Sequence, residues 1–252
     1  MRSVGIDIGS SGTKYVVMED QALLYHRTIP TGFSSVKAAQ QAKEDMETRG
    51  YDMALLPCIS TGYGRGSVPY AAKTLTEITC HGRGAAHLMQ KETFSVIDIG
   101  GQDTKVIRME GGSVKEFTMN DKCAAGTGRF LEVMASAMEL EPEALCRIAK
   151  RGGNVHISSM CTTFAESEVI SLIGQGVSRQ DIACGIVESI VNKVVSQCGM
   201  VESGGSYYLT GGLCECPYIA EMLSRALGAQ VETGPMARYA GAVGAALYAR
   251  EL

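Results

Sequence analysis

The sequence predicts an α/β fold of two lobes, in which each lobe is a mixed sheet flanked by helices. Two segments of the 252-residue chain, residues 5–14 (GIDIGSSGTK) and 96–105 (VIDIGGQDTK), are near repeats of each other. Each begins with an apolar run typical of a buried strand, turns at an Asp-x-Gly-x-x-x-Thr-Lys element and continues into a second apolar run. A β-hairpin that occurs twice in this way indicates a duplicated, two-lobed architecture.

Hydrophobic spacing places further strands and helices around these two hairpins. Apolar runs of strand length predict strands at residues 3–8, 13–18, 23–29, 52–60, 94–99, 104–109, 114–119 and 207–210. Apolar residues three and four apart predict helices at residues 36–48, 82–89, 128–138, 142–150, 163–173, 179–199, 218–227 and 241–252. We assign residues 1–94, with the C-terminal helix at 239–252, to a first lobe and residues 95–238 to a second.

The composition argues against several classes of protein. With 45% hydrophobic and 20% charged residues, the chain can bury a sizeable core. A net charge of −4 without a block rich in Lys or Arg argues against nucleic-acid binding. The apolar runs are far shorter than the roughly 20 residues of a membrane span, and the N-terminus leads straight into a strand. Nine cysteines without a secretion signal indicate a reducing compartment, so we expect a cytoplasmic protein that binds neither nucleic acid nor membrane.

The turn of the first hairpin has the residue types that bind phosphate. Glycines let the backbone come close to a phosphate, hydroxyl and N–H groups donate hydrogen bonds to it, and a lysine adds positive charge. The residues expected to do so are Gly9, Ser10, Ser11, Gly12, Thr13 and Lys14. Asp7, at the end of the preceding strand, is placed to hold a hydrated Mg²⁺ through water, because Mg²⁺ usually takes one or two carboxylates together with phosphate oxygens.

The second hairpin repeats this design. Its expected nucleotide-binding residues are Asp98, Gly100, Gly101 and Thr104. Gln102 and Asp103 occupy the remaining turn positions, where a side chain could position water, and with Asp7 they are the candidate catalytic residues. A plain glycine turn would explain either hairpin alone, but two matched copies favour phosphate binding.

A third element, Leu209-Thr210-Gly211-Gly212-Leu213, is a strand followed by a diglycine turn, which allows an adenosine to lie against bare backbone at Gly211, Gly212 and Leu213. The order of hairpin, hairpin and diglycine turn resembles the acetate and sugar kinase, heat-shock chaperone and actin superfamily, which has a ribonuclease H-like fold, over nearly the whole chain. The resemblance implies an actin-like ATPase fold that closes around ATP or ADP at a hinge. Residues 238–246 look like the small-residue helix that crosses back to the first lobe.

Two cysteines stand close before helix-like runs: Cys123 in NDKCAAGTGR (residues 120–129) and Cys161 in SSMCTTF (residues 158–164). A thiolate at a helix N-terminus is stabilised by the helix dipole and by free N–H groups. Without their flanking residues, a core cysteine would be the simpler interpretation, as it is for Cys58, Cys80, Cys146, Cys184 and Cys198. Cys214 and Cys216, beside the diglycine turn, are favoured as structural thiols without a settled role. None of the four histidines shows metal-ligand spacing.

Three strings closely resemble one family over almost the full length of the chain. Residues 98–103, 120–130 and 161–168 resemble the ATP-dependent activators, or component A, of 2-hydroxyacyl-CoA dehydratases. The same family includes ATPase subunits of benzoyl-CoA reductase and reductases of double-cubane-cluster proteins. The resemblance implies a homodimer with one 4Fe-4S cluster at its interface. Cys123 and Cys161 of each copy supply its thiolates, since an all-cysteine cubane cluster takes four.

The resemblance also implies a mechanism. A low-potential donor such as ferredoxin or flavodoxin reduces the cluster, and ATP then binds with Mg²⁺. Lobe closure changes the angle between two helices, which begin at residues 124–130 and 162–168 and whose N-termini aim at the cluster. The electron then passes to an iron-sulfur dehydratase or a double-cubane-cluster partner. Gly126, Thr127 and Gly128 would couple the two events because their loop follows Cys123 and can lie near the terminal phosphates.

Two other functions are compatible with the fold resemblance. A small-molecule kinase would need a catalytic carboxylate facing a substrate pocket, and Gln102 together with the lack of substrate-sized insertions speaks against it. A non-enzymatic actin-like assembly protein would make no use of Cys123 and Cys161. We therefore expect an oxygen-sensitive iron-sulfur ATPase that donates single electrons.

Overall fold

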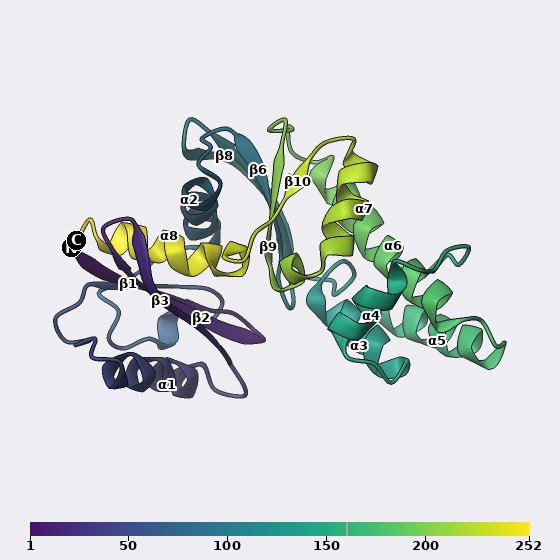
Figure 1. Ribbon diagram of the computed structural model, residues 1–252, viewed down its shortest axis with the longest axis horizontal. Helices are drawn as coiled ribbons and strands as arrows, with labels where there is room; N and C mark the ends of the chain where they lie inside the picture. The colour runs from purple at the N-terminus through teal and green to yellow at the C-terminus, as the bar shows by residue number, and fades with distance from the viewer. Residues whose placement is uncertain (160) are drawn as a thin grey trace.

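Two five-stranded mixed sheets with the same internal order form the framework of the protein (Figure 1). The computed structural model describes residues 1–159 and 161–252. The first sheet has the order β3-β2-β1-β4-β5 and consists of Arg2–Ile8 (β1), Gly12–Glu19 (β2), Ala22–Pro30 (β3), Cys58–Thr61 (β4) and Lys73–Thr74 (β5). The second has the order β10-β9-β6-β7-β8 and consists of Phe94–Ile99 (β6), Thr104–Glu110 (β7), Ser113–Asn120 (β8), Tyr207–Gly211 (β9) and Val231–Glu232 (β10).

The duplication extends to the register of the two hairpins. Asp7 pairs with Lys14 across β1 and β2, and Asp98 pairs with Lys105 across β6 and β7. In both sheets, three antiparallel strands are followed by two parallel ones. Each sheet has its register shift at the same point of its second strand. The predicted two-lobed α/β architecture of mixed sheets is confirmed.

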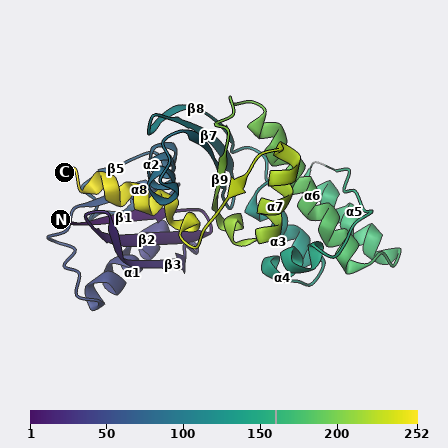
Figure 2. The same ribbon diagram turned by 45° about the horizontal axis from the view of Figure 1, so that its top comes forward.

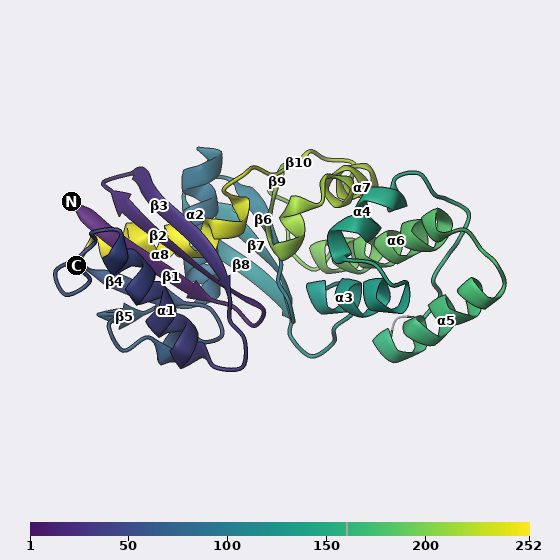
Figure 3. The same ribbon diagram turned by 60° about the horizontal axis from the view of Figure 1, so that its bottom comes forward.

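Eight α-helices lie in the part of the chain that the structure describes. They are Ser35–Thr48 (α1), Glu77–Met89 (α2), Gly128–Ala137 (α3), Pro142–Ala149 (α4), Thr162–Gly174 (α5), Arg179–Cys198 (α6), Pro217–Leu227 (α7) and Ala240–Ala249 (α8). None of them is long and apolar enough to cross a membrane. Helices α3 to α7 gather at one end of the molecule, beyond the second sheet (Figure 3).

The two largest differences between predicted and observed boundaries lie at the starts of α2 and β4. Helix α2 begins at Glu77 rather than residue 82, because the Thr76 side chain caps it by accepting a hydrogen bond from the N–H of Thr79. The strand predicted at residues 52–60 is limited to β4, since residues 52–56 form a turn. In this turn the Asp52 side chain accepts a hydrogen bond from the N–H of Ala54, and the Asp52 carbonyl accepts hydrogen bonds from those of Leu55 and Leu56.

Alternating residues place the first sheet between two helices. Tyr15 and Val17 pack with α1, whereas Val16 and Met18 pack with α8, as expected where successive side chains of a strand point to opposite faces. Helix α8 also crosses α2 in close contact, and α2 packs against the strands of the second sheet (Figures 1 and 2). Helices α2 and α8 therefore join the two sheets, and the division of the chain at residue 94 stays a prediction.

Glycines let these two joining helices touch through their backbones. A Cβ atom on Gly84 of α2 would lie 1.8 Å from the carbonyl oxygen of Ala240, and one on Gly244 of α8 would lie 1.9 Å from that of Cys80. Real Cβ atoms do not approach backbone so closely, so any larger residue must push the helices apart.

We expect Gly244→Ala to lower the free energy of unfolding by about 1–3 kcal/mol, the usual cost of overpacking. Urea denaturation followed by circular dichroism measures it. Gly174→Ala, at the last residue of α5, is the matched control because no atom lies within 4 Å of its added Cβ. Equal stabilities of Gly244→Ala and wild type would contradict the close packing of α2 and α8.

Candidate functional site

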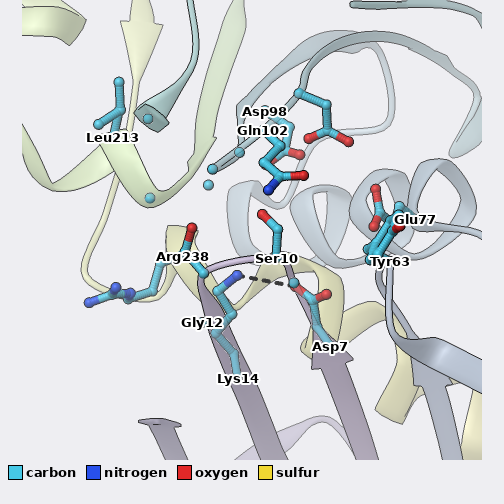
Figure 4. A pocket seen from close by; sticks show the side chains of 18 of the residues that line it. Asp7, Ser10, Gly12, Lys14, Tyr63, Glu77, Asp98, Gln102, Leu213 and Arg238 are labelled. Atoms are coloured by element: carbon cyan, nitrogen blue, oxygen red, sulfur yellow. Dashed lines mark ion pairs between the residues drawn. The ribbon is translucent and has the colours of Figure 1, made fainter. Parts of the chain in front are cut away.

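A cavity of about 710 Å³ lies where the turns of the two hairpins meet. Its walls come from both turns, the N-terminal part of α2, the turn after β9 and the first turns of α3 and α4. Figure 4 shows Asp7 and Lys14 entering it from neighbouring strands, with Asp98 and Gln102 on the opposite side. The volume is within the range of pockets that hold cofactors.

Most of the expected nucleotide-binding and catalytic residues line this cavity. They are Asp7, Gly9, Ser10, Ser11, Gly12, Lys14, Asp98, Gly100, Gly101, Gln102, Asp103, Gly128, Gly211, Gly212 and Leu213. Thr13, Thr104, Gly126 and Thr127 do not line it. Their polar groups hold the loops instead: Thr13 shares a hydrogen bond of 2.9 Å with Thr31, and Thr104 Oγ1 donates to the carbonyl of Gly126 at 2.7 Å.

The turns of the two hairpins have matching geometry and contact each other. The N–H of Gly9 donates to the carbonyl of Gly12 at 3.1 Å, and that of Gly100 donates to the carbonyl of Asp103 at 2.9 Å. A Cβ atom on Gly101 would lie 2.4 Å from Ser11 Oγ. The absence of a side chain at Gly101 therefore allows the serine hydroxyls of the first turn to reach the backbone of the second.

Lys105 is a buried cation among three carboxylates. Its Nζ lies 2.8 Å from Glu77 Oε2, 2.8 Å from Asp103 Oδ1 and 3.3 Å from Asp98 Oδ2, and the residue is 3% exposed. Burial alone would lower the pKa of Lys105, but the three carboxylates hold it above its usual range. Lys14 was predicted to belong to the site and Lys105 was not, although Lys105 occupies the same position in the second copy of the repeat.

Helix α2 supplies two more polar side chains that were not predicted from the sequence. Glu77 and His81 stand one helical turn apart and both line the cavity. His81 Nδ1 lies 3.4 Å from Asp98 Oδ1. Burial alone would raise the pKa of Asp98, but the charges of His81 and Lys105 and a hydrogen bond from Thr210 hold it well below its usual range. The histidines lack metal-ligand spacing and were assigned surface or core roles. The Glu-x-x-x-His spacing could have indicated a shared helix face, but the helix was predicted only from residue 82.

The turn after β9 presents the expected bare backbone. Gly211 has a φ of 82°, and a Cβ atom there would lie 2.3 Å from the carbonyl oxygen of Ile99, so only glycine fits. A short 3₁₀ turn, Gly212–Glu215, follows. Arg238, which was not predicted as a site residue, lines the cavity beside this turn and donates a hydrogen bond of 2.6 Å to Glu215 Oε1.

Cys123 and Cys161 are exposed, whereas the other seven cysteines are buried: Cys58, Cys80, Cys146, Cys184, Cys198, Cys214 and Cys216. Cys161 is the N-cap residue of α5, and the nearby backbone N–H groups of Phe164 and Thr163 lower the pKa of its thiol. Within residues 1–159 and 161–252, no three His, Cys, Asp or Glu side chains are grouped so that they could hold a metal ion. Two exposed thiols in one chain fit half of a four-thiolate donor set.

The helix after Cys123 begins at the residue that the hydrophobic spacing predicts. Residues 124–127 form a turn in which Gly126 has a φ of 80°, and α3 starts at Gly128. The N–H groups of Gly128 and Arg129 donate to the carbonyls of Gly100 at 2.9 Å and Gly101 at 2.8 Å. The N-terminus of α3 is therefore hydrogen-bonded to the second hairpin. It lies within residues 124–130, where a helix start was expected, and the aim of this helix at a cluster stays a prediction.

The model of the BadF/BadG/BcrA/BcrD ATPase family matches residues 4–249. The chain belongs to this family. It is 40% identical to the (R)-2-hydroxyglutaryl-CoA dehydratase activating ATPase of Acidaminococcus fermentans, over 98% of this chain and 96% of the relative. It is 37% identical to the activator of lactoyl-CoA dehydratase of Anaerotignum propionicum, over 100% of this chain and 98% of the relative.

Solved structures agree with this assignment. Component A of the A. fermentans dehydratase matches with a TM-score of 0.94 at 38% identity, covering 100% of this chain and 98% of that one. The activator of 2-hydroxyisocaproyl-CoA dehydratase from Clostridium difficile with bound ADPNP matches with a TM-score of 0.93 at 35% identity, covering 100% and 95%. A Streptomyces griseus glucokinase, at 13% identity and a TM-score of 0.64, shares the fold alone. The predicted actin-like fold and ATPase activity are confirmed.

We expect Lys105→Met to lower the free energy of unfolding at pH 7 by about 3–5 kcal/mol, because it leaves buried carboxylates without their cation. The depressed pKa of Asp98 contributes stability above the unfolded pKa of about 3.9, and this stability is lost as the pH falls through the folded value. Removing Lys105 takes away part of that stability. The difference in the free energy of unfolding between variant and wild type should therefore shrink as the pH falls from about 5 toward about 2.

Urea denaturation at several pH values tests this expectation. Lys115→Met, at an exposed lysine paired with Glu110, is the matched control and should cost less than about 1 kcal/mol. A stability difference for Lys105→Met that stays constant over this acidic range would mean that the ion pairs of Lys105 do not set the pKa of Asp98.

Proposed function

We propose that the chain is an ATP-dependent single-electron donor that activates a cluster-containing partner enzyme, such as a 2-hydroxyacyl-CoA dehydratase. In this proposal it works as a homodimer that shares one 4Fe-4S cluster, with Cys123 and Cys161 of each copy as ligands. The observation that carries the proposal is that these two thiols alone among the nine cysteines are exposed. In addition, the helix that follows Cys123 is hydrogen-bonded to the second hairpin, whose turn lines the cavity.

The cavity supports the nucleotide part of the proposal. The turns of the two hairpins offer Ser10, Ser11 and glycine backbone to the phosphates. Lys14 lines the same cavity, and its Nζ lies 3.7 Å from Asp7 Oδ2. Asp7 and Asp98 are both 3% exposed. Asp7 is the carboxylate expected to hold hydrated Mg²⁺, and we assign the same role to Asp98, its equivalent in the second hairpin. Gln102 and Asp103 are the expected water-positioning residues. The ADPNP bound to the C. difficile activator is consistent with this use.

The thiols support the redox part. A 4Fe-4S cluster held by four thiolates can take up and release one electron at a low potential. Cys161 stands at the N-terminus of α5, where nearby backbone N–H groups lower the pKa of its thiol and so favour the thiolate form that binds iron. Neighbouring backbone N–H groups and the helix dipole would favour the additional negative charge of the reduced state. Electrons would come from a donor such as ferredoxin or flavodoxin.

The contacts of α3 offer a path from nucleotide to thiols. Gly128 and Arg129 are hydrogen-bonded to the second hairpin, and Thr104 is hydrogen-bonded to Gly126 in the turn that follows Cys123. Helix α3 packs against α5, which begins directly after Cys161. A movement of the second hairpin on closure would therefore reach both cysteines through packed elements, which is what coupling between two sites requires.

The names of the relatives suggest the class of partner. The relatives from A. fermentans and An. propionicum are described as activators of acyl-CoA dehydratases, and a relative at 27% identity belongs to the benzoyl-CoA reductase of Thauera aromatica. A 2-hydroxyacyl-CoA dehydratase is therefore our first choice, and a double-cubane-cluster protein with another substrate is the alternative. Pull-down of the partner from an anaerobic extract distinguishes them.

Replacing either exposed thiol should remove the cluster. Wild type purified anaerobically should be brown, with about four iron atoms per dimer, whereas Cys123→Ser and Cys161→Ser should each retain less than about one. Iron analysis and the visible spectrum measure this, and ADP binding confirms that the variants are folded. Cys214→Ala and Cys216→Ala are the controls that should keep the iron. Full iron in both serine variants would exclude this ligand set.

Asp7→Asn should separate nucleotide turnover from cluster binding. Loss of the carboxylate that holds hydrated Mg²⁺ is expected to lower kcat for ATP hydrolysis by at least about a hundredfold, while iron content and the spectrum of the reduced cluster remain those of wild type. Asp20→Asn, at an exposed carboxylate that pairs with the N-terminus, is the control. Normal ATP-dependent electron transfer in Asp7→Asn would contradict the coupling scheme.

A further inference from the structure

His81 stands at the point where both hairpins, α2 and β9 meet. It is 5% exposed and extends from α2, which joins the two sheets. Its Nε2 lies 3.9 Å from Asp7 Oδ2, at the end of β1, and its Nδ1 lies 3.4 Å from Asp98 Oδ1, at the end of β6. One imidazole therefore contacts the equivalent carboxylates of both copies of the repeat.

The hydrogen bonds around the ring identify the atom that carries hydrogen. Thr210 Oγ1 donates its single hydrogen to Asp98 Oδ1 at 3.0 Å, and it also lies 3.4 Å from His81 Nδ1. The hydroxyl oxygen and the ionised carboxylate can then only accept from Nδ1, so Nδ1 must be the donor. The separation of 3.9 Å between Nε2 and Asp7 is longer than a hydrogen bond, so on that side the ring acts as a spacer.

Helix α8 leaves no room for the ring to move away. A Cβ atom on Gly241 would lie 2.7 Å from His81 Nε2 and 2.9 Å from Asp7 Oδ2. The close backbone contacts at Gly84 and Gly244 hold α2 against α8 on either side of this point. The ring is therefore wedged between two carboxylates and a helix backbone.

We propose that His81 is a positioning residue that sets the spacing of Asp7 and Asp98, and through it the geometry of the hydrated Mg²⁺ that these carboxylates receive with the nucleotide. The proposal rests on the Mg²⁺ role given to Asp7 and Asp98 under the proposed function, and it adds a residue outside both hairpins to that site. Because Asp7 belongs to the first sheet and Asp98 to the second, a spacer on α2 also limits how closely the two sheets approach at this point.

Two substitutions separate this role from simple packing. Leucine keeps much of the volume of His81 but has no donor, whereas Asn places an N–H donor at the same distance from Cβ as Nδ1. If His81 only fills space, His81→Leu should function at least as well as His81→Asn. If its Nδ1–H holds Asp98 in place, Asn should restore the part of the loss that comes from Asp98, although it does not replace the side of the ring that faces Asp7.

The test measures ADP affinity by calorimetry with Mg²⁺ and with EDTA, and steady-state ATP hydrolysis, on the full-length protein. His81→Leu should weaken binding of Mg²⁺–ADP about tenfold and lower kcat by a similar factor, while the affinity for ADP in EDTA stays within about twofold. His81→Asn should recover to within about threefold of wild type. His87→Leu, on the same helix but lining a separate hollow, is the matched control.

A wild-type Mg²⁺ dependence in His81→Leu, or equal loss in the Leu and Asn variants, would overturn the proposal. If His81→Leu does not fold, Gly241→Ala tests the geometry of the same cluster, because its methyl group would crowd both the His81 ring and the Asp7 carboxylate. It should weaken Mg²⁺–ADP binding and spare ADP binding in EDTA; equal weakening of both would also overturn the proposal. None of these measurements uses iron or the partner, so they remain decisive if the electron-donor function fails its own tests.

Discussion

The site depends on keeping several charges buried where the two sheets meet. Asp98 and Lys105 are each 3% exposed, and burying a single charge without a partner would cost several kcal/mol. The protein offsets this cost by pairing: Lys105 contacts three carboxylates, and Asp98 additionally contacts Thr210 and His81. A fixed, buried set of charges of this kind keeps the carboxylates oriented, which suits the hydrated cation and the phosphates that we propose for this site.

The pairing requires side chains from helices as well as from hairpins, and the contact between α2 and α8 brings them into place. Glycine at residues 84 and 244 allows the helix backbones to touch, and this packing directs Glu77 and His81 toward the second hairpin. The same two helices join the sheets. In the proposed closure of the two lobes, α2 and α8 would move with the sheets that they join. Because α2 also carries Glu77 and His81, that movement would change the geometry of the buried charges.

The two exposed cysteines differ in their surroundings. Cys161 is the N-cap residue of α5, and nearby backbone N–H groups lower the pKa of its thiol, whereas Cys123 is separated from α3 by a four-residue turn. The first N–H groups of α3 are used by the carbonyls of Gly100 and Gly101. In the proposed dimer, the N-terminus of α5 at Cys161 would stabilise the negative charge of the cluster. The turn after Cys123 would move when the nucleotide site moves.

The order of residues along the chain was enough to predict the duplicated hairpins, their phosphate-binding turns, the actin-like ATPase fold and the family, because these features lie in short contiguous segments with fixed spacing. It also distinguished Cys123 and Cys161 from the other cysteines. Only the folded chain shows that the charge pairing is completed by Lys105, Glu77 and His81. It also shows that α3 is hydrogen-bonded to the second hairpin. Those contacts join residues from different elements, and hydrophobic periodicity, which reports how each element faces the core, carries no information about which polar side chains meet there.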